Sequence, residues 1–326
     1  MKKCALFCGG YSSEHDISLK SAQNIYANFP KEFEAIKVIV NKQRWQVLYK
    51  GQELDYNFQN PGFYYNDTFI KFDFAFIFIH GNPGENGKIQ GYLDLFEVPY
   101  VNSNALTSSL SFDKWYCNNY LKALGISVAN ATAVRRNTTY NTEKLLKTIG
   151  LPMFVKPSDS GSSYGISKVK EENELLPALD FAFKEGDTVV LESFLNGREI
   201  TCAVYQNKKG IQTLPLTEIV SENEFFDFDA KYNGKSDEIT PARIDSHHET
   251  LIRSLAIRVY ELLQLRSFVR IDFMLVGDTP YVIEVNTIPG FSNESIVPKM
   301  LKEANIVSEF FLKEIIEFEL QGSNSI

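Results

Sequence analysis

Apolar residues in the first hundred positions form short, nearly continuous runs separated by polar or amphipathic stretches. Such runs predict strands covered on both faces, as in a parallel sheet, at residues 4–10, 33–40 and 72–80. The amphipathic stretches predict helices at residues 12–29 and 88–97. Because strand and helix alternate, we expect a doubly wound, Rossmann-like α/β domain over residues 1–104.

The pattern changes near residue 105, where shorter strands mix with helices. Helical periodicity predicts helices at residues 111–125, 141–150 and 173–186. Apolar runs predict strands at residues 151–157 and 166–170. The expected unit is a small central α+β domain over residues 105–187.

From residue 188 onward strand patterns dominate. They predict strands at residues 188–195, 198–206, 210–220, 267–277 and 280–287. Helices are predicted at residues 249–265 and 307–320. These elements predict a C-terminal domain, built on a mainly antiparallel sheet, over residues 188–326.

The last two predicted strands carry acids in otherwise apolar sequence. The turn-rich sequence VGDTP joins them, so we expect a hairpin in which Asp272 lies near Glu284. Strict alternation in the second strand places on one apolar face Tyr281, Ile283 and Val285, and on the other Val282, Glu284 and Asn286. Two close carboxylates repel unless a proton or a cation lies between them, and Mg²⁺ prefers oxygen ligands. The pattern indicates either a metal site with Arg270 beside it or a solvated sheet face with an Arg–Asp ion pair.

A loop rich in serine and glycine, residues 158–165, follows a strand that ends near Lys156. Consecutive backbone N–H groups in such a loop can bind phosphate oxygens, and a nearby lysine adds positive charge. The loop lacks the G-K-[ST] ending of a P-loop, and a flexible connector is the alternative interpretation. Lys114 and Lys231 are further candidate cations, although single lysines are commonly solvated. Glu192 and Glu199 are acids on apolar strands, with either a buried or a solvent-facing role.

Glu14 and His80 follow two of the predicted N-terminal strands. Ligands bind at the carboxyl ends of the strands in doubly wound sheets, so both residues are candidates for a site. Glu14 is equally compatible with the first turn of a helix, where the helix dipole favours acids. The neighbouring glycine loops lack G-x-G-x-x-G spacing, which argues against a nicotinamide-dependent dehydrogenase.

The chain has 33 Lys and Arg residues and 41 Asp and Glu residues, a formal net charge of −8. This balance argues against nucleic acid and membrane surfaces as partners, because both require a basic face. Cys4, Cys8, Cys117 and Cys202 have neither metal-pair nor disulfide-framework spacing, so reduced thiols in a cytoplasmic protein are expected. No apolar run approaches the ~20 residues of a membrane span.

Seven segments resemble, in order, motifs of the D-alanine:D-alanine ligases of the ATP-grasp superfamily. They are GGYSSEHDISL, HGNPGENGKIQGYLD, FDKWYCNNYLKALGI, KPSDSGSSYGISKV, LESFLNGREITCAV, FFDFDAKYNGKS with ITPARI, and VRIDFMLVGDTPYVIEVNTIPGFSNES. Each segment is modest alone, but their common order over nearly the whole chain makes the resemblance specific.

The resemblance implies a three-domain ATP-grasp fold with ATP between the central and C-terminal domains. It implies that ATP phosphorylates the carboxylate of one D-alanine, and that the amine of a second D-alanine displaces phosphate. The dipeptide would serve peptidoglycan precursor synthesis. The resemblance also implies two Mg²⁺ ions, which Mn²⁺ can replace, and a homodimer.

Site residues carry over from the same motifs. The metal ligands implied by the resemblance are Asp272, Glu284 and Asn286, with Glu284 as the bridge. The phosphate-contacting residues are Lys114, Lys156, Lys231 and Ser163. The residues that match adenine and ribose contacts are Ile166, Glu192, Ser193, Phe194, Leu195, Glu199, Phe225 and Met274.

Two groups of substrate residues are implied in the same way. Glu14 matches the residue that receives the ammonium group of the first D-alanine, and His80 lies near that substrate's carboxylate. Ser162 and Tyr232 match a hydrogen-bonded bridge to Glu14 that ties a closing loop over the site. Such a loop keeps water away from an acyl phosphate.

The remaining substrate roles are implied for residues of the predicted hairpin and of the segment that follows it. Arg270 and the backbone N–H of Gly290 match the oxyanion site for the tetrahedral intermediate. Ser295 and Ile296 match the clamp on the carboxylate of the second D-alanine.

The chain departs from the family pattern in three places. The phosphate loop reads SDSGSSYG where SREGSSVG is common, FFDFDAKY carries phenylalanines in place of tyrosines, and Ser193 replaces a frequent lysine. Tyr232 favours dipeptide-forming ligases over relatives that make D-alanyl-D-lactate. The alternatives are a related ligase with another nucleophile, such as D-lactate, and a non-catalytic nucleotide-binding module.

Overall fold

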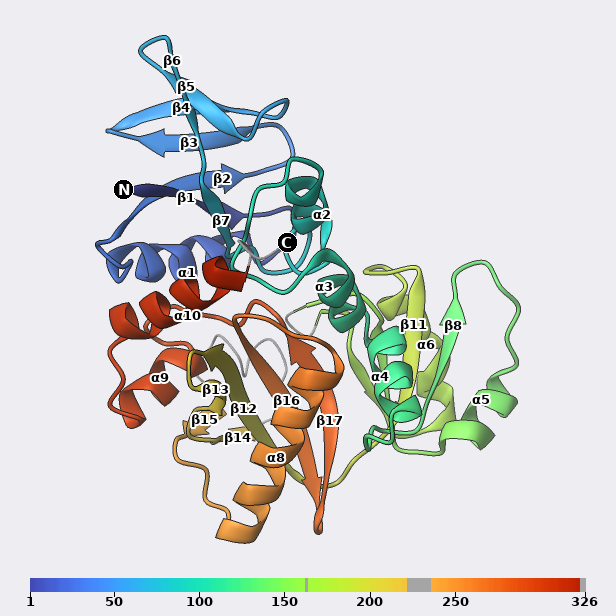
Figure 1. Cartoon of the computed structure of the whole chain (residues 1–326). Coiled ribbons are helices and arrows are strands. Elements are labelled where there is room, and N and C mark those ends of the chain that lie inside the picture. Colours follow the sequence, from blue (N-terminus) through green and yellow to red (C-terminus); the bar gives the residue numbers. More distant parts are fainter. Residues whose placement is uncertain (162–163, 222–235, 323–326) are drawn as a thin grey trace.

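The computed structural model describes residues 1–161, 164–221 and 236–322 (Figure 1). Within these residues three β-sheets follow one another along the chain, each with helices of its own. The architecture is the expected mixture of α/β and α+β parts. The division into domains at residues 104 and 187 stays a prediction.

The N-terminal sheet joins a parallel part to an antiparallel extension. Its strands, in spatial order, are β6 (Thr68–Lys71), β5 (Gly62–Tyr65), β4 (Gln52–Asn57), β3 (Trp45–Tyr49), β2 (Phe33–Val40), β1 (Lys2–Gly9) and β7 (Phe74–Ile77). Strand β1 lies parallel to both β2 and β7, and helices α1 (His15–Ala27) and α2 (Lys88–Leu95) follow β1 and β7. These parallel strands and helices confirm the prediction. The extension β3 to β6 occupies a stretch for which the sequence pattern predicted no strand.

The second sheet has the strand order β10 (Ser167–Val169), β9 (Met153–Pro157), β11 (Thr188–Ser193) and β8 (Ala131–Arg135). Its core is closed by helices α5 (Thr142–Ile149) and α6 (Leu175–Ala182), the latter preceded by a short 3-10 turn, Glu172–Glu174. Two helices lead into this sheet, α3 (Ala105–Phe112) and α4 (Lys114–Ala123). A single helix over residues 111–125 was predicted, and α3 was missed. The break falls at Asp113, whose extended backbone ends α3 and whose side chain caps α4 by accepting the Tyr116 N–H.

The third sheet is antiparallel. Its strands are β15 (Ser236–Ile239), β14 (Thr217–Ser221), β12 (Arg198–Asn207), β16 (Phe268–Val276) and β17 (Thr279–Asn286), with β13 (Gly210–Thr213) paired to the end of β12. The prediction of one strand over residues 210–220 is wrong: β13 and β14 are separate, and Pro215 between them has no N–H to donate to a sheet. Helix α8 (Ser246–Leu262) covers one face, and in Figure 1 it crosses in front of β12 and β16.

The N-terminal sheet shares its hydrophobic core with the end of the chain. Helices α9 (Ile296–Glu303) and α10 (Ser308–Gly322) contribute buried residues to the same cluster as β1, β2 and β7. Aromatic rings connect them: Phe78 lies 6.1 Å from Phe291, and Phe291 stacks on Phe311 of α10 at 6.4 Å. Figure 1 shows α10 between the N-terminal and the third sheet. This shared core fixes the loops after β1 and β7 against the third sheet.

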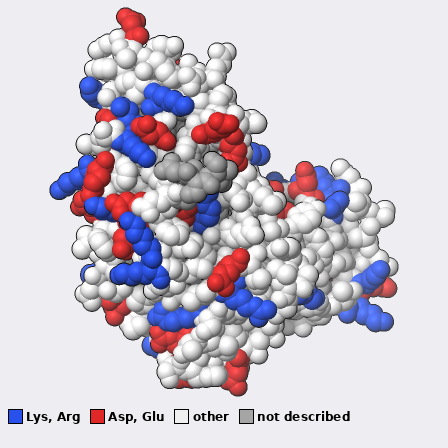
Figure 2. Space-filling view, viewed as in Figure 1, with Lys and Arg blue, Asp and Glu red and all other residues white. Residues whose placement is uncertain are grey.

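The surface carries charges of both signs. On the face that Figure 2 shows, lysines and arginines are interspersed with acids. Within the described part of the chain, every helix is too short or too polar to cross a bilayer.

Candidate functional site

A pocket of about 360 Å³ opens between the N-terminal sheet, the loop after β9 and the third sheet. Its wall contains predicted residues for both substrates. It also contains two of the three predicted metal ligands and one of the two predicted phosphate-contacting lysines that the structure describes. The predicted residues on its wall are Glu14, His80, Lys114, Arg270, Glu284, Asn286, Gly290, Ser295 and Ile296. The structure therefore brings together residues that are up to 282 positions apart in the sequence (296 − 14).

The β16–β17 hairpin forms with the predicted pairing at its acidic positions. Asp272 is the cross-strand neighbour of Glu284, and Arg270 is that of Asn286. Just beyond this point the register shifts, because Phe273 pairs with Val282 and Ile283 is left over. The predicted alternation along β17 is therefore wrong on one side of the bulge. Val282 and Val285 both enter the hydrophobic core.

Asp272 is held by side chains on three strands. Nε and Nη2 of Arg270 donate to its two carboxylate oxygens, each at 2.8 Å. Asn286 Nδ2 donates to Oδ2 at 3.0 Å, and Thr201 Oγ1 donates to Oδ1. The buried Asp272 carboxylate is thus charge-balanced by a two-point contact with a guanidinium, while Arg270 and Asn286 themselves reach the pocket wall.

The donor set at this hairpin fits a hard divalent cation. Glu284, Asp272 and the amide oxygen of Asn286 are all oxygen donors, and the amide nitrogen of Asn286 is already turned toward Asp272. Mg²⁺ and Mn²⁺ accept such sets, usually together with phosphate oxygens. Among the described residues no three Asp, Glu, His or Cys side chains cluster so that they could hold a metal ion, and this set therefore depends on the asparagine.

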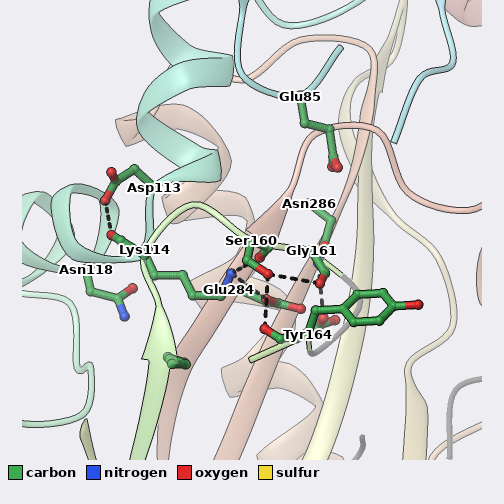
Figure 3. Close-up of polar contacts among 12 residues, drawn as sticks. Glu85, Asp113, Lys114, Asn118, Ser160, Gly161, Tyr164, Glu284 and Asn286 are labelled. Carbon is green, nitrogen blue, oxygen red and sulfur yellow. Dashed lines mark hydrogen bonds and ion pairs between the residues drawn. The ribbon is translucent and has the colours of Figure 1, made fainter. Parts of the chain in front are cut away.

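Lys114 reaches the acidic residues of the β16–β17 hairpin from α4. It is the first residue of that helix and is nearly buried, and its Nζ lies 3.8 Å from Glu284 Oε2. The same Nζ donates to the carbonyl oxygen of Ser160 at 2.7 Å, as Figure 3 shows. Lys114 therefore links the loop after β9 to β17, with its cation between a carboxylate and the predicted phosphate loop.

The predicted phosphate loop begins as expected at the end of β9. Ser158 accepts the Trp115 N–H through its Oγ, and Ser160 Oγ donates to the carbonyl oxygen of Tyr164. Gly161 leaves room for Glu14: a β-carbon on Gly161 would lie only 2.4 Å from Glu14 Oε2. A side chain at position 161 would displace that carboxylate.

Lys156 and Glu192 form a buried ion pair across neighbouring strands β9 and β11. Lys156 Nζ lies 2.6 Å from Glu192 Oε2, and Asn118 Nδ2 donates to Glu192 Oε1 at 3.3 Å. Both side chains are less than a tenth exposed. The resemblance implies separate contacts to phosphate and adenine for these two residues. The structure brings them into direct contact with one another.

The predicted adenine residues that the structure describes belong to the second and third sheets and to the segments next to their strands. The Phe194 ring lies 5.9 Å from that of Phe154, and Lys168 Nζ stands 3.9 Å above it. Glu199 and Met274 are cross-strand neighbours on β12 and β16. The other three positions, Ile166, Ser193 and Leu195, are partly exposed beside these strands. An aromatic ring with a cation above it suits a flat, electron-rich base.

His80 is held in one protonation state by its neighbours. Its Nδ1 donates to the carbonyl oxygen of Ile288 at 2.9 Å, and its Nε2 accepts from Ser21 Oγ at 3.1 Å. Burial lowers the pKa of His80, with a partly opposing effect of the Glu14 carboxylate. The imidazole is therefore neutral near pH 7 and joins the end of β7 to the segment after β17. Both ring nitrogens therefore already have protein partners.

The far end of the pocket is the N-terminus of α9. Ser295 is the N-cap residue, but its Oγ accepts the Ser292 N–H at 3.0 Å instead of capping its own helix. The first N–H groups of a helix attract anions when no side chain caps them. A β-carbon on Gly290 would lie 2.9 Å from Ser295 Oγ, so a larger residue at position 290 would displace that side chain.

Two pocket features were missed from the sequence. Glu85, in the glycine loop 81–87, lines the pocket, and burial together with the neighbouring Glu14 raises its pKa to about 8. Glu238 on β15 also lines it and pairs with Lys299 of α9 at 2.8 Å. A lone acid among glycines and a pair 61 positions apart leave no periodic signal. Five predicted residues lie outside the described residues: Ser162, Ser163, Phe225, Lys231 and Tyr232.

The fold and the pocket together define a class of protein. An antiparallel sheet facing a smaller sheet across a lysine-bearing loop is the ATP-grasp fold, whose members use ATP to activate a carboxylate. Family models support the same class: one described as D-ala D-ala ligase N-terminus matches residues 3–103, and one described as D-ala D-ala ligase C-terminus matches residues 120–317. The chain belongs to the D-alanine–D-alanine ligase family.

Relatives of known name agree over the full length. The chain is 41% identical to the D-alanine–D-alanine ligase of Parabacteroides distasonis, over 98% of each protein. It is 43% identical to that of Porphyromonas gingivalis, over 97% of this chain and 96% of the relative.

Solved structures have the same fold. The VanG D-Ala:D-Ser ligase from Enterococcus faecalis superposes with a TM-score of 0.85 at 31% identity, covering 98% of this chain and 99% of that one. D-alanyl-alanine synthetase A from Vibrio cholerae gives 0.87 at 30% identity, covering 98% of both chains. A D-alanine–D-alanine ligase from Bacillus anthracis, solved in complex with ATP, gives 0.80 at 26% identity over 99% of both.

Proposed function

We propose that this chain joins two D-alanine molecules into D-alanyl-D-alanine and converts ATP to ADP and phosphate. The observation that carries the proposal is the single pocket in which Glu284, Asn286, Lys114 and Arg270 lie together. A carboxylate is a poor electrophile, and phosphorylation gives it a phosphate leaving group. Transfer of the phosphoryl group requires its charge to be balanced by positioned cations, which this wall of the pocket supplies.

The first D-alanine is proposed to bind at the N-terminal side of the pocket. The buried Glu14 carboxylate offers a partner for its ammonium group, and neutral His80 fixes the chain around it. The carboxylate of this substrate then points toward Lys114 and Arg270. Its oxygen attacks the terminal phosphorus of ATP, and D-alanyl phosphate forms.

The second D-alanine is proposed to bind with its carboxylate at the N-terminus of α9, near Ser295. Its amine attacks the carbonyl carbon of D-alanyl phosphate, and phosphate leaves. The Gly290 N–H and Arg270 are proposed to stabilise the oxyanion that forms. Both groups belong to the hairpin and the segment that follows it, so their spacing is set by packed backbone.

The metal ligands are proposed to be Asp272, Glu284 and Asn286, for two Mg²⁺ ions or for Mn²⁺. A bound divalent cation would neutralise phosphate charge in this acidic pocket. The oxygen-only donor set and the facing carboxylates support this assignment. The Lys156–Glu192 pair and the Phe194 ring are proposed to line the nucleotide end.

A related activity with D-serine as the second substrate is the alternative candidate. The similarity to a D-Ala:D-Ser ligase at 31% identity favours considering it. D-Lactate is the third nucleophile to compare, and Tyr232 is the residue on which the preference for an amine is proposed to depend.

The test is phosphate release from ATP by the purified protein with each substrate in turn. The expected result is release that requires both D-alanine and Mg²⁺, with D-alanyl-D-alanine as the main product when D-alanine, D-serine and D-lactate compete. Absence of D-alanine-dependent release contradicts the proposal. If the main product contains D-serine, or is the ester with D-lactate, the proposed activity is replaced by ligation of D-alanine to that second substrate. We also propose a cytoplasmic homodimer that supplies peptidoglycan precursor synthesis, which sedimentation and depletion of the gene product test.

A further inference from the structure

Ser292 and Ser295 form a closed turn at the far end of the pocket. The Ser292 N–H donates to Ser295 Oγ at 3.0 Å, and the Ser295 N–H donates to the Ser292 carbonyl oxygen at 2.9 Å. The two hydroxyl oxygens lie 2.8 Å apart, so one hydroxyl group donates to the other. Both residues line the pocket. The turn is therefore held by hydrogen bonds of its own, at the end where the second D-alanine is proposed to bind.

The turn lies between two groups that are proposed to contact the reacting molecules. Ser295 is the N-cap residue of α9, and its side chain leaves the first N–H groups of that helix uncapped. On the other side, a β-carbon on Gly290 would lie 2.9 Å from Ser295 Oγ and 3.4 Å from Ser295 Cβ. Ser295 is thus close to the residue whose N–H is proposed to stabilise the oxyanion. The position of the Ser295 side chain therefore matters to both sites.

Charged side chains near the turn do not favour a carboxylate. Glu294 lies directly before Ser295 and lines the pocket, as does Glu238 of β15. Lys299 offsets Glu238 at 2.8 Å, whereas Glu294 is exposed and forms no ion pair with any described residue. A substrate carboxylate at this end must therefore be bound by neutral donors, namely the N–H groups of α9 and the Ser295 hydroxyl. Its affinity depends on how these donors are oriented.

A carboxylate accepts hydrogen bonds and donates none, so it distinguishes two orientations of the hydroxyl pair. If Ser292 donates, Ser295 Oγ accepts from both the hydroxyl and the N–H of Ser292, and its own proton is available to the substrate. If Ser295 donates instead, it presents only a lone pair to the pocket, and this repels a carboxylate. The first orientation is the one that suits the substrate, and a chain of two hydroxyl groups strengthens its last hydrogen bond.

We propose that Ser292 is a positioning residue for the second substrate, an inference that rests on the proposed ligation. Its hydroxyl donates to Ser295 Oγ and so directs the Ser295 proton toward the carboxylate at the N-terminus of α9. The same bond keeps Ser295 Oγ away from the N–H groups of its own helix, which the carboxylate needs. Ser292 acts through Ser295, so its effect falls on binding of the second D-alanine and not on formation of D-alanyl phosphate.

Two products separate this role from a general loss of structure. Dipeptide formation uses a second substrate that carries a carboxylate. Hydroxylamine also attacks an acyl phosphate and gives a hydroxamate, but it has no carboxylate and does not use the turn. Formation of the acyl phosphate from ATP and D-alanine is common to both products. The ratio of dipeptide to hydroxamate at low D-alanine therefore reports on binding of the second substrate.

The experiment replaces the Ser292 hydroxyl in matched variants. Ser292→Ala is expected to raise the KM for the second D-alanine roughly fivefold, the scale of one neutral hydrogen bond. The kcat, the KM for ATP and the rate of hydroxamate formation are expected to stay near their original values. Ser292→Thr and Ser292→Val have side chains of the same shape, but only Thr keeps a hydroxyl group. Ser292→Thr is therefore expected to keep the original KM, and Ser292→Val to behave as Ser292→Ala.

Asn293→Ala changes the exposed neighbour within the turn and is expected to leave both products unchanged. An unchanged KM in Ser292→Ala, or the same KM in Ser292→Thr and Ser292→Val, overturns the proposal because the hydroxyl group then has no effect. An equal fall of dipeptide and hydroxamate in Ser292→Ala also overturns it, because the role is then structural. If the unmodified protein forms neither product, the proposed function itself fails.

Discussion

Lys299 of α9 donates to Glu238 of β15, with its Nζ 2.8 Å from Oε2. The pair joins the strand edge of the third sheet to the helix whose N-terminus closes the pocket. Glu238 faces the pocket, so Lys299 offsets a negative charge near the end at which a substrate carboxylate is proposed to bind.

Lys299→Met is expected to raise the KM for the second D-alanine with little change in kcat. The variant leaves the Glu238 carboxylate unbalanced, and a like charge weakens carboxylate binding by about 1 kcal/mol, roughly fivefold in affinity. Steady-state kinetics at low and high salt measure the change in KM. Lys302→Met, an exposed lysine on the same helix, is the matched control. The double variant with Glu238→Gln is expected to recover the original KM, and failure to recover it argues against a charge effect.

Glu284→Gln is expected to reduce turnover by more than about 100-fold without unfolding the protein. The change removes a charge opposite Asp272 and beside Lys114 but keeps the side-chain volume. Phosphate release measures activity, and circular dichroism with a thermal melt measures the fold. Glu261→Gln, on the exposed side of α8, should behave as the unmodified protein in both assays. Near-normal turnover of Glu284→Gln would falsify the assignment of Glu284 as a metal ligand.

His80 is expected to make stability depend on pH on the acid side. Its folded pKa is lowered by burial, so the unfolded chain binds a proton that the folded chain does not. The free energy of unfolding therefore falls as pH drops below about 6.5, the unfolded value. His80→Asn is expected to melt lower at pH 7.5 but to lose less of its melting temperature on going to pH 5.5. Parallel losses in both proteins would show that other groups cause the acid dependence.

His248 is expected to give stability the opposite dependence on pH. It lies at the start of α8 between two acids, with Nδ1 2.7 Å from Asp245 and Nε2 3.2 Å from Asp278. The hydrogen bond with Asp245 is the main cause that raises its pKa. Its contribution to stability is full below about 6.5 and is lost as pH rises through the raised value.

His248→Gln should therefore lower the melting temperature at pH 6 and have less effect at pH 9. His247→Gln, the exposed neighbour, is the control and should show no such difference. If both variants change the melt equally at the two pH values, the two ion pairs do not titrate as the geometry indicates.

The sequence predicted those parts of the site that follow from periodicity. Asp272 and Glu284 could be placed opposite one another because strands alternate and a short turn joins them. The bulge at Ile283 could not be predicted, since an extra residue in a strand leaves no mark in composition. The extension β3 to β6 was missed for a related reason. Its strand β4 is largely exposed and polar, so it lacks the apolar run of a buried strand.

Electrostatic interactions between elements that are distant in the chain could not be predicted from the sequence. The pKa of Glu85 depends on acids and a lysine from three other parts of the chain, and only folding brings them together. The Lys156–Glu192 pair shows the same limit. Each residue is a reasonable ligand candidate alone, but strand pairing makes them partners of one another.

The shared aromatic core has a consequence for synthesis of the protein. Phe311, Leu312, Ile315 and Ile316 of α10 belong to the same buried cluster as Leu6, Val38 and Phe76 of the first sheet. A ribosome makes the strands of that sheet first and the helix that completes their core last. The nascent N-terminal third therefore keeps an uncovered apolar face until nearly the whole chain has emerged.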